Sequence, residues 1–233
     1  LCSRRAERVE AAGEKLGIPD TSTDWVQFVR RDDLDVIVVC TPVDLHHEQA
    51  MAAIAAGKHL LIEKPVGVDS VQTGEMLAAA EAAGVAHAVC FEGRWEPPRY
   101  ECWQMVESGY LGDPYFVTAR TGGDFWHPSR GLQSEWMYRL DHGGGYLMGM
   151  GSHDIDYACA LFGDPVAVCA DLKTSVRQRL RDDGSILAVD ADGLRDLRAV
   201  SRASEITRRL LRRWRLPEWC VAAIAGLSLT PDT

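Results

Sequence analysis

The chain of 233 residues has no long apolar run, no paired cysteine motif and no excess of positive charge. Its longest apolar runs, such as DVIVVC and AHAVCF, are much shorter than the roughly 20 residues that a membrane-spanning helix needs. The start of the chain also lacks the charged and then apolar pattern of a secretory signal. We therefore expect a cytoplasmic protein with no membrane partner.

The seven cysteines are scattered between Cys2 and Cys220, and none belongs to a CxxC pair. Such a set suits neither a disulfide framework nor a zinc site. His127, His142 and His153 show no ligand spacing with carboxylates or thiols, so we expect no metal. The net charge of -9 argues against a nucleic-acid partner.

Helical and strand patterns alternate through the first part of the chain. DVIVVC, HLLIEKP and VAHAVCF are apolar strand patterns, and the Ala-rich segments LHHEQAMAAIAAGK and SVQTGEMLAAAEAAG separate them as helices. Strands buried on both faces with helices between them form right-handed βαβ units. The sequence therefore predicts an α/β fold, with a Rossmann-type parallel sheet domain over residues 1–92.

The pattern changes after residue 92. A helix from Pro98 to Ser108, a strand PYFVTAR, a long aromatic loop and a strand PVAVCADLKTSV indicate a second domain over residues 93–192. Residues 193–233 form a tail with eight arginines and four acidic residues. Two interpretations of this tail stay open: a solvated basic helix, or an aberrant sequence translated out of frame.

One strand pattern, LLIEKPVG over residues 60–67, ends in two opposite charges. In open α/β sheets the ligand crevice lies outside the carboxyl ends of the strands. Lys64 precedes Pro65, which holds its backbone extended, so the ammonium group has a defined direction. It could hydrogen-bond a substrate hydroxyl as hydride leaves, and the alternative is an ordinary ion pair with Glu63 at a strand end.

The segment DLDVIVVCTPVDLHHEQAMAAIAAGKHLLIEKPVG resembles the Gfo/Idh/MocA family of oxidoreductases, the relatives of glucose-fructose oxidoreductase and inositol dehydrogenase. The resemblance continues through RWEPP, ESGYLGDPYFVTAR and GGGYLMGMGSHDIDYACALFGDP, and so covers about residues 1–176. It implies a Rossmann domain that binds NAD or NADP, followed by a partial α+β domain with an open antiparallel sheet. The implied reaction is hydride transfer between a nicotinamide and a hydroxyl-bearing carbon of a sugar, cyclitol or diol.

The resemblance also assigns residues to the site. Lys64 is implied to hydrogen-bond the reacting hydroxyl, His153 to be the acid/base, and Thr41, Pro42, His46 and Glu63 to line the cofactor. A capping role at the start of the next helix is the alternative for His46, and a place in the core is the alternative for His153. The expected partner is a small polyol or sugar-like molecule.

The start of the chain, LCSRRAER, resembles the turn after the second Rossmann strand. Dinucleotide folds place an acidic residue there for NAD and an arginine for the 2′-phosphate of NADP. Because Ser3, Arg4 and Arg5 precede any acidic residue, we expect NADP, with NAD possible and a solvated helix start as the alternative.

Three features depart from the family pattern. No GxGxxG turn is present, and we expect it to precede Leu1 in a longer protein, with further strands missing after residue 190. The family commonly has an Asp four residues before the acid/base His, where this chain has Gly149. Loss of that carboxylate partner predicts lower activity or a different substrate.

These departures leave other readings beside the enzyme: a non-catalytic regulator that binds the cofactor, an inactive gene fragment, or a relative that cleaves glycosidic bonds by transient oxidation. The weaker substrate candidates are Arg94, Trp95, Trp136 and Asp156, within a set that also contains Glu92, Trp126 and His127. The alternatives are packing between domains for the aromatic residues and an arginine pair for Asp156. If the chain is complete, we expect a homo-oligomer.

Overall fold

The computed structural model describes residues 1–112, 127–191 and 196–201. The predicted strand PYFVTAR, Trp126 and residues 202–233 lie outside this description. The chain divides into two units, one of Leu1–Cys90 with Asp141–Gly143, and one of Phe91–Leu140 with Gly144–Thr233.

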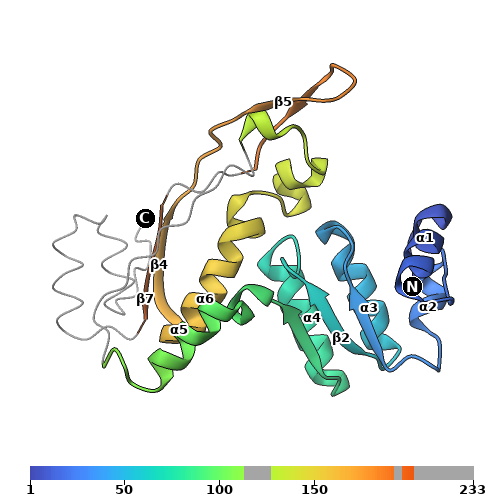
Figure 1. Cartoon of the computed structure of the whole chain (residues 1–233), viewed down its shortest axis with the longest axis horizontal. Coiled ribbons are helices and arrows are strands. Elements are labelled where there is room, and N and C mark those ends of the chain that lie inside the picture. Colours follow the sequence, from blue (N-terminus) through green and yellow to red (C-terminus); the bar gives the residue numbers. More distant parts are fainter. Residues whose placement is uncertain (113–126, 192–195, 202–233) are drawn as a thin grey trace, which may run out of the picture. The chain divides into compact units, whose positions relative to one another are not determined.

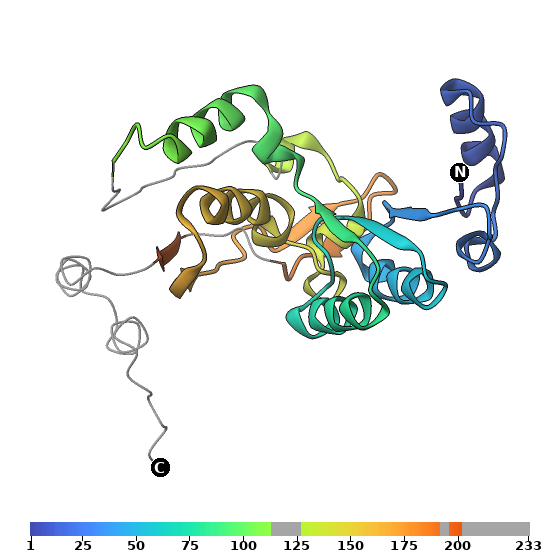
Figure 2. The same ribbon diagram turned by 90° about the horizontal axis from the view of Figure 1, so that it is seen from below.

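The first unit is built on three parallel strands in the order β1-β2-β3. Its elements are α1 (Ala6–Leu16), α2 (Trp25–Val29), β1 (Val36–Val39), η1 (Val43–Leu45), α3 (His46–Ala55), β2 (His59–Glu63), α4 (Ser70–Ala83) and β3 (His87–Cys90). Helices α3 and α4 are the crossovers and lie on the same side of the sheet (Figures 1 and 2). The predicted βαβ arrangement is thus confirmed.

Side-chain alternation explains which face of this sheet is covered. Ile37, Val39, Leu60 and Ile62 point toward the helices and form the core with the alanines of α3 and α4. Val36 and Val38 point the other way and keep 51% and 56% of their exposure. One face of β1 is therefore apolar and open to solvent.

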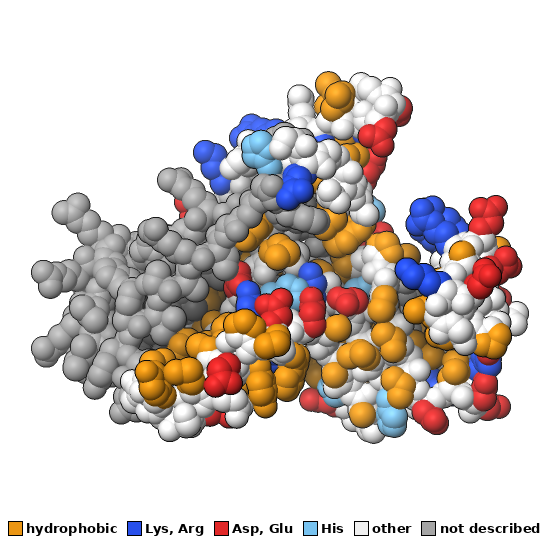
Figure 3. Space-filling model, in the orientation of Figure 1, with side chains coloured by type: hydrophobic (Ala, Val, Ile, Leu, Met, Phe, Trp, Pro, Cys, Tyr) orange, Lys and Arg blue, Asp and Glu red, His pale blue; other side chains and the backbone are white. Residues whose placement is uncertain are grey.

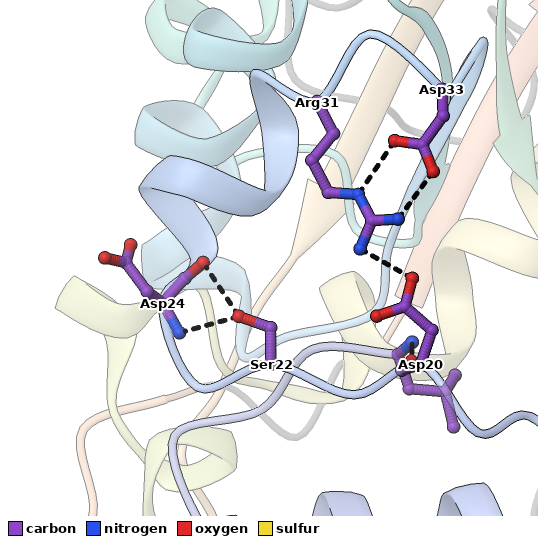
Figure 4. Close-up of polar contacts among 6 residues, drawn as sticks. Asp20, Ser22, Asp24, Arg31 and Asp33 are labelled. Atoms are coloured by element: carbon purple, nitrogen blue, oxygen red, sulfur yellow. Dashed lines mark hydrogen bonds and ion pairs between the residues drawn. The ribbon is translucent and has the colours of Figure 1, made fainter.

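Arg31 organises the segment that leads into β1 (Figure 4). Its guanidinium donates to Asp33 at 2.9 Å and lies 2.6 Å from a carboxylate oxygen of Asp20. These contacts raise the pKa of Arg31, and the guanidinium lowers the pKa of Asp33. The Lys58 ammonium donates to the Arg31 carbonyl at 2.7 Å. Because Lys58 directly precedes β2, this bond holds the segment before β1 to the start of β2. Asp24 accepts a hydrogen bond from the Gln27 backbone N–H and so caps α2.

The second unit contains two antiparallel strand pairs, β4–β7 and β5–β6. Its elements are η2 (Glu92–Trp95), α5 (Pro97–Glu107), η3 (Pro128–Arg130), η4 (Glu135–Tyr138), the π-helical η6 (Leu147–Gly151), α6 (Ser152–Phe162), β4 (Pro165–Asp171), β5 (Gln178–Leu180), β6 (Ile186–Ala188) and β7 (Asp196–Ser201). The short helix η5 (Leu140–His142) begins in this unit, and its last two residues belong to the first unit. A parallel sheet followed by antiparallel strands confirms the predicted fold class. Residues 196–201, predicted as part of a basic tail, form a strand through their pairing with β4.

Within the described residues, no helix combines the length and the apolar composition needed to cross a bilayer.

Candidate functional site

The three parallel strands of the first unit end at the same edge. Val39 pairs with Ile62, and Glu63 pairs with Cys90, so the segments after β1, β2 and β3 leave the sheet side by side. Burial, and then the charge of Glu63, raise the pKa of the Cys40 thiol, which shows that the end of β1 lies near that carboxylate. This is the edge at which an open α/β sheet binds its ligand.

Lys64 follows the last residue of β2, as the sequence predicts. The Glu63 carboxylate accepts a hydrogen bond from the Lys64 backbone N–H at 3.1 Å. The Lys64–Pro65 peptide bond is cis, Pro65 is buried and Lys64 is half-buried. Glu63 therefore fixes the backbone from which the lysine side chain projects.

His46 is a buried brace between two loops of this edge. Its Nε2 lies 2.8 Å from the Thr41 carbonyl, and its Nδ1 lies 3.0 Å from the Pro65 carbonyl and 3.3 Å from that of Val66. Leu45, not His46, is the N-cap residue of α3, and the partners of the His46 ring are carbonyls of two loops, which argues against the capping alternative. His46 thus holds the loop after β1 against the loop that contains Lys64.

The Thr41–Pro42 segment is held by α3 as well. The Thr41 hydroxyl donates to the Gln49 side-chain carbonyl at 2.8 Å, and Pro42 directly precedes η1. Gln49 is a residue that our sequence reasoning missed. Its signal was present, because Gln49 lies three residues after His46 and so shares its helix face.

Ser3, Arg4 and Arg5 lie exposed at the beginning of α1. The Ser3 N–H donates to the Ser22 carbonyl at 3.1 Å, which joins this segment to the one that precedes α2. Arg5 is extended and no side chain caps the helix, so first-turn N–H groups of α1 are available beside two guanidinium groups. This donor set suits an anionic ligand such as a phosphate.

In the second unit, Arg94 and Asp156 bind each other. Arg94 Nε donates to one oxygen of Asp156 at 2.8 Å, and Nη2 contacts the other oxygen. The carboxylate, which is only 10% exposed, raises the pKa of Arg94. Two predicted substrate residues are therefore joined in a bidentate pair that fastens η2 to α6, as the alternative for Asp156 anticipated.

His153 lies in the first turn of α6, directly after the π-helical η6. The Phe91 ring meets its imidazole edge-on with centroids 5.7 Å apart, and a carboxylate oxygen of Glu92 lies 3.7 Å from Nε2. Gly149 lies inside η6, where the turn is wider than in an α-helix. His153 follows four residues later in α6, so the two positions lie in segments of different helix type.

Aromatic side chains gather beside these residues. Trp95, Tyr100 and Trp103 form three mutual ring contacts, with centroids 5.6–6.1 Å apart, and the Arg94 guanidinium lies 5.9 Å from the Trp103 ring. Trp95 is 59% exposed, and exposed hydrophobic side chains continue over α5 (Figure 3). Trp136 lies apart from this sequence segment, in η4, where its carbonyl accepts a hydrogen bond from the Arg139 N–H.

Comparisons with known proteins agree with this architecture. Residues 1–91 match the family model of an oxidoreductase family with an NAD-binding Rossmann fold, and residues 101–208 match the model of the GFO/IDH/MocA C-terminal domain. An NADP-dependent scyllo-inositol 2-dehydrogenase of Bacillus subtilis is 32% identical, over 60% of this chain and 38% of that enzyme.

Two solved structures are similar as well. The crystal structure of an NAD-binding oxidoreductase from Klebsiella pneumoniae has a TM-score of 0.72 at 32% identity, and covers 82% of this chain and 51% of its own. The structure of levoglucosan dehydrogenase in complex with NADH and levoglucosan has a TM-score of 0.71 at 26% identity, and the match covers 88% of this chain and 57% of that chain. The curated enzyme of that name comes from Pseudarthrobacter phenanthrenivorans. The chain spans about half the length of the relatives that it matches.

Proposed function

The chain belongs to the Gfo/Idh/MocA family of oxidoreductases, and from this we propose that it interconverts a hydroxyl and a carbonyl on a sugar, cyclitol or diol with NADP. The observation that carries the proposal is the placement of Lys64 after a buried strand, at the edge of a parallel sheet where ligands bind. The nicotinamide, when bound, accepts or supplies the hydride. Because the relatives found are dehydrogenases and reductases, the regulator and the gene fragment are not favoured.

The chain's own residues divide the remaining work. Lys64 donates a hydrogen bond to the oxygen of the reacting carbon and stabilises the negative charge that develops on it. His153 takes the hydroxyl proton during oxidation and returns it during reduction. His46, Thr41 and Glu63 hold the strand-end loops around which the cofactor packs, and the brace made by His46 keeps Lys64 in register.

The choice of NADP rests on Arg4 and Arg5. A guanidinium group binds phosphate through paired N–H donors, and the uncapped start of α1 adds backbone donors beside it. A cation at a helix N-terminus opposes the helix dipole, so two arginines here cost stability unless an anion binds them. NAD, which lacks the 2′-phosphate, would leave both arginines in solvent.

Nucleotide binding by the full chain tests the proposal. We expect NADPH to bind more tightly than NADH, and the double variant Arg4→Ala/Arg5→Ala to lose about tenfold or more of its NADPH affinity, since a hydrogen bond to a charged group contributes about 1.5–3 kcal/mol. NADH affinity should stay the same. Titration calorimetry or quenching of tryptophan fluorescence measures both.

Arg8→Ala is the matched control, because Arg8 is exposed on the same helix. Equal or tighter binding of NADH, or a double variant that behaves like Arg8→Ala, would contradict the choice of NADP. NADP+ reduction with scyllo-inositol or levoglucosan as substrate tests the reaction itself. Lys64→Met should lower that turnover at least 100-fold and leave NADPH binding in place.

The seven cysteines are scattered along the sequence and none belongs to a CxxC pair, which is typical of proteins from a compartment that keeps thiols reduced. We therefore propose that the protein works in the cytoplasm.

A further inference from the structure

Glu92 is the carboxylate that faces the imidazole of His153. Its Oε1 lies 3.7 Å from Nε2, and the His153 side chain is only 11% exposed. We propose that Glu92 is a positioning residue for His153, whose carboxylate stabilises the imidazolium form and so sets the pH range in which His153 works. The inference rests on the acid/base role of His153 in the proposed function.

The elements that carry the two residues are fastened together. Glu92 begins η2 directly after Phe91, whose ring packs edge-on against the imidazole. One helical turn beyond His153, the bidentate Arg94–Asp156 pair ties η2 to α6. Gly93 of η2 lies beside the other ring nitrogen, since a Cβ there would lie 3.4 Å from His153 Nδ1. The Nε2 edge of the ring is thus directed toward the start of η2.

Two other charged pairs lie near His153 in the described part of the chain. Arg94 of η2 neutralises Asp156, and Arg99 of α5 lies 3.7 Å from Asp154. Burial is the main cause that raises the pKa of Tyr157, to about 12, so this neighbour on α6 stays neutral near pH 7. The side chains of η6 contain no titratable group.

Within the described part of the chain, Glu92 makes one ion pair, which is its contact with His153. Glu92 is 64% exposed, so solvent weakens the electrostatic attraction between its carboxylate and the charged imidazole without removing it. An opposite charge at this range favours the charged form of an imidazole. Removing the charge should accordingly lower the pH at which His153 titrates, by roughly half a pH unit.

Histidine titration by NMR, with the full chain and no ligand added, measures this effect. The signal that disappears in His153→Gln identifies the residue among the seven histidines. We expect the titration midpoint of that signal to fall by roughly half a unit in Glu92→Gln, to fall less in Glu92→Asp, and to converge with the native midpoint at 1 M salt, where the Debye length is about 3 Å.

Glu96→Gln is the matched control, because Glu96 lies four residues further along and contacts Arg99 at 3.6 Å. The unchanged signals of the other six histidines show that each variant is folded. A midpoint that stays at the native value in Glu92→Gln, or that moves equally in Glu96→Gln, overturns the proposal. Since no cofactor or substrate enters the measurement, a chain that fails to bind NADPH refutes the proposed function and leaves this result standing on its own.

Discussion

His46 joins two loops that the sequence separates by some twenty residues. Both of its ring nitrogens face backbone carbonyls, and its side chain is 1% exposed. A neutral imidazole carries one N–H and an imidazolium carries two, so the loops depend on this residue for their donors. The motif TPVDLH drew attention to His46, but its bracing role was not predictable, because Pro65 and Val66 come close only when β1 and β2 pair.

We therefore predict that His46→Leu, which keeps a similar volume and removes the polar ring nitrogens, lowers the free energy of unfolding by roughly 1–3 kcal/mol. The physical reason is that buried carbonyl oxygens lose their partners. The neighbouring His47 is half-exposed and contacts Glu75 at 2.8 Å, which makes His47→Leu the control, with a change within about 0.5 kcal/mol. Urea denaturation compares the two. Equal losses in both variants would show that the two loops do not depend on His46 for their stability.

At the scale of elements, apolar periodicity predicted β1, β2, β3 and the two crossover helices. These elements bury apolar side chains against one another, and the spacing of those side chains is visible in the sequence. Strand β7 was missed, because its residues DLRAVS alternate over only four positions and lie in an Arg-rich segment, and the strand is defined by its pairing with β4. The π-helical η6 was missed as well, since its sequence fits an α-helix. Pairing and local helix type depend on tertiary contacts.

The contact between Glu92 and His153 belongs with these misses. Both residues were noticed in the sequence, Glu92 in a segment expected to face the cleft and His153 as the acid/base. Sixty-one positions separate them, and only the packing of η2 against α6 brings them together. Family spacing directed attention to residue 149 and away from Glu92.

The three glycines at 143–145, just before η6, form a tight turn that only glycine can adopt, rather than a phosphate-binding turn. The Gly144 N–H donates to the Arg139 carbonyl at 2.9 Å, and a Cβ on Gly144 would lie 2.5 Å from the Trp136 carbonyl oxygen and 2.6 Å from that of Met137. Both obstacles are backbone atoms, which cannot rotate away as a side chain can. Only glycine fits this turn.

Gly144→Ala should consequently destabilise the protein by roughly 1–3 kcal/mol or more, the range of overpacking in a dense site. Gly74→Ala is the control: Gly74 lies inside α4 with nothing within 4 Å of its would-be Cβ, and alanine should stabilise the helix by roughly 0.5–1 kcal/mol. Thermal unfolding distinguishes opposite signs directly. A tolerated Gly144→Ala would mean that the turn can open without loss.

At the scale of the whole molecule, the open apolar face of β1 is the feature that bears on association. In the described sheet, β1 is an edge strand that pairs only with β2, and Val36 and Val38 point away from the helices. An unpaired strand edge can pair with the backbone of another chain, and an exposed apolar face can pack against an apolar surface of another chain. Such a surface favours self-association of this chain.

We predict concentration-dependent self-association that decreases in the double variant Val36→Thr/Val38→Thr, because threonine keeps the shape and the strand propensity while it removes apolar area. Sedimentation velocity should show the average mass of the variant closer to 25.7 kDa than that of the native chain at the same concentration. Val71→Thr changes a similarly exposed valine, 65% exposed on α4, and should leave the mass distribution unaltered. A native chain that stays at 25.7 kDa at every concentration would contradict an interface on β1. Association that persists in the double variant would show that another surface forms the interface. The exposed aromatic side chains over α5 are the next candidate for that surface.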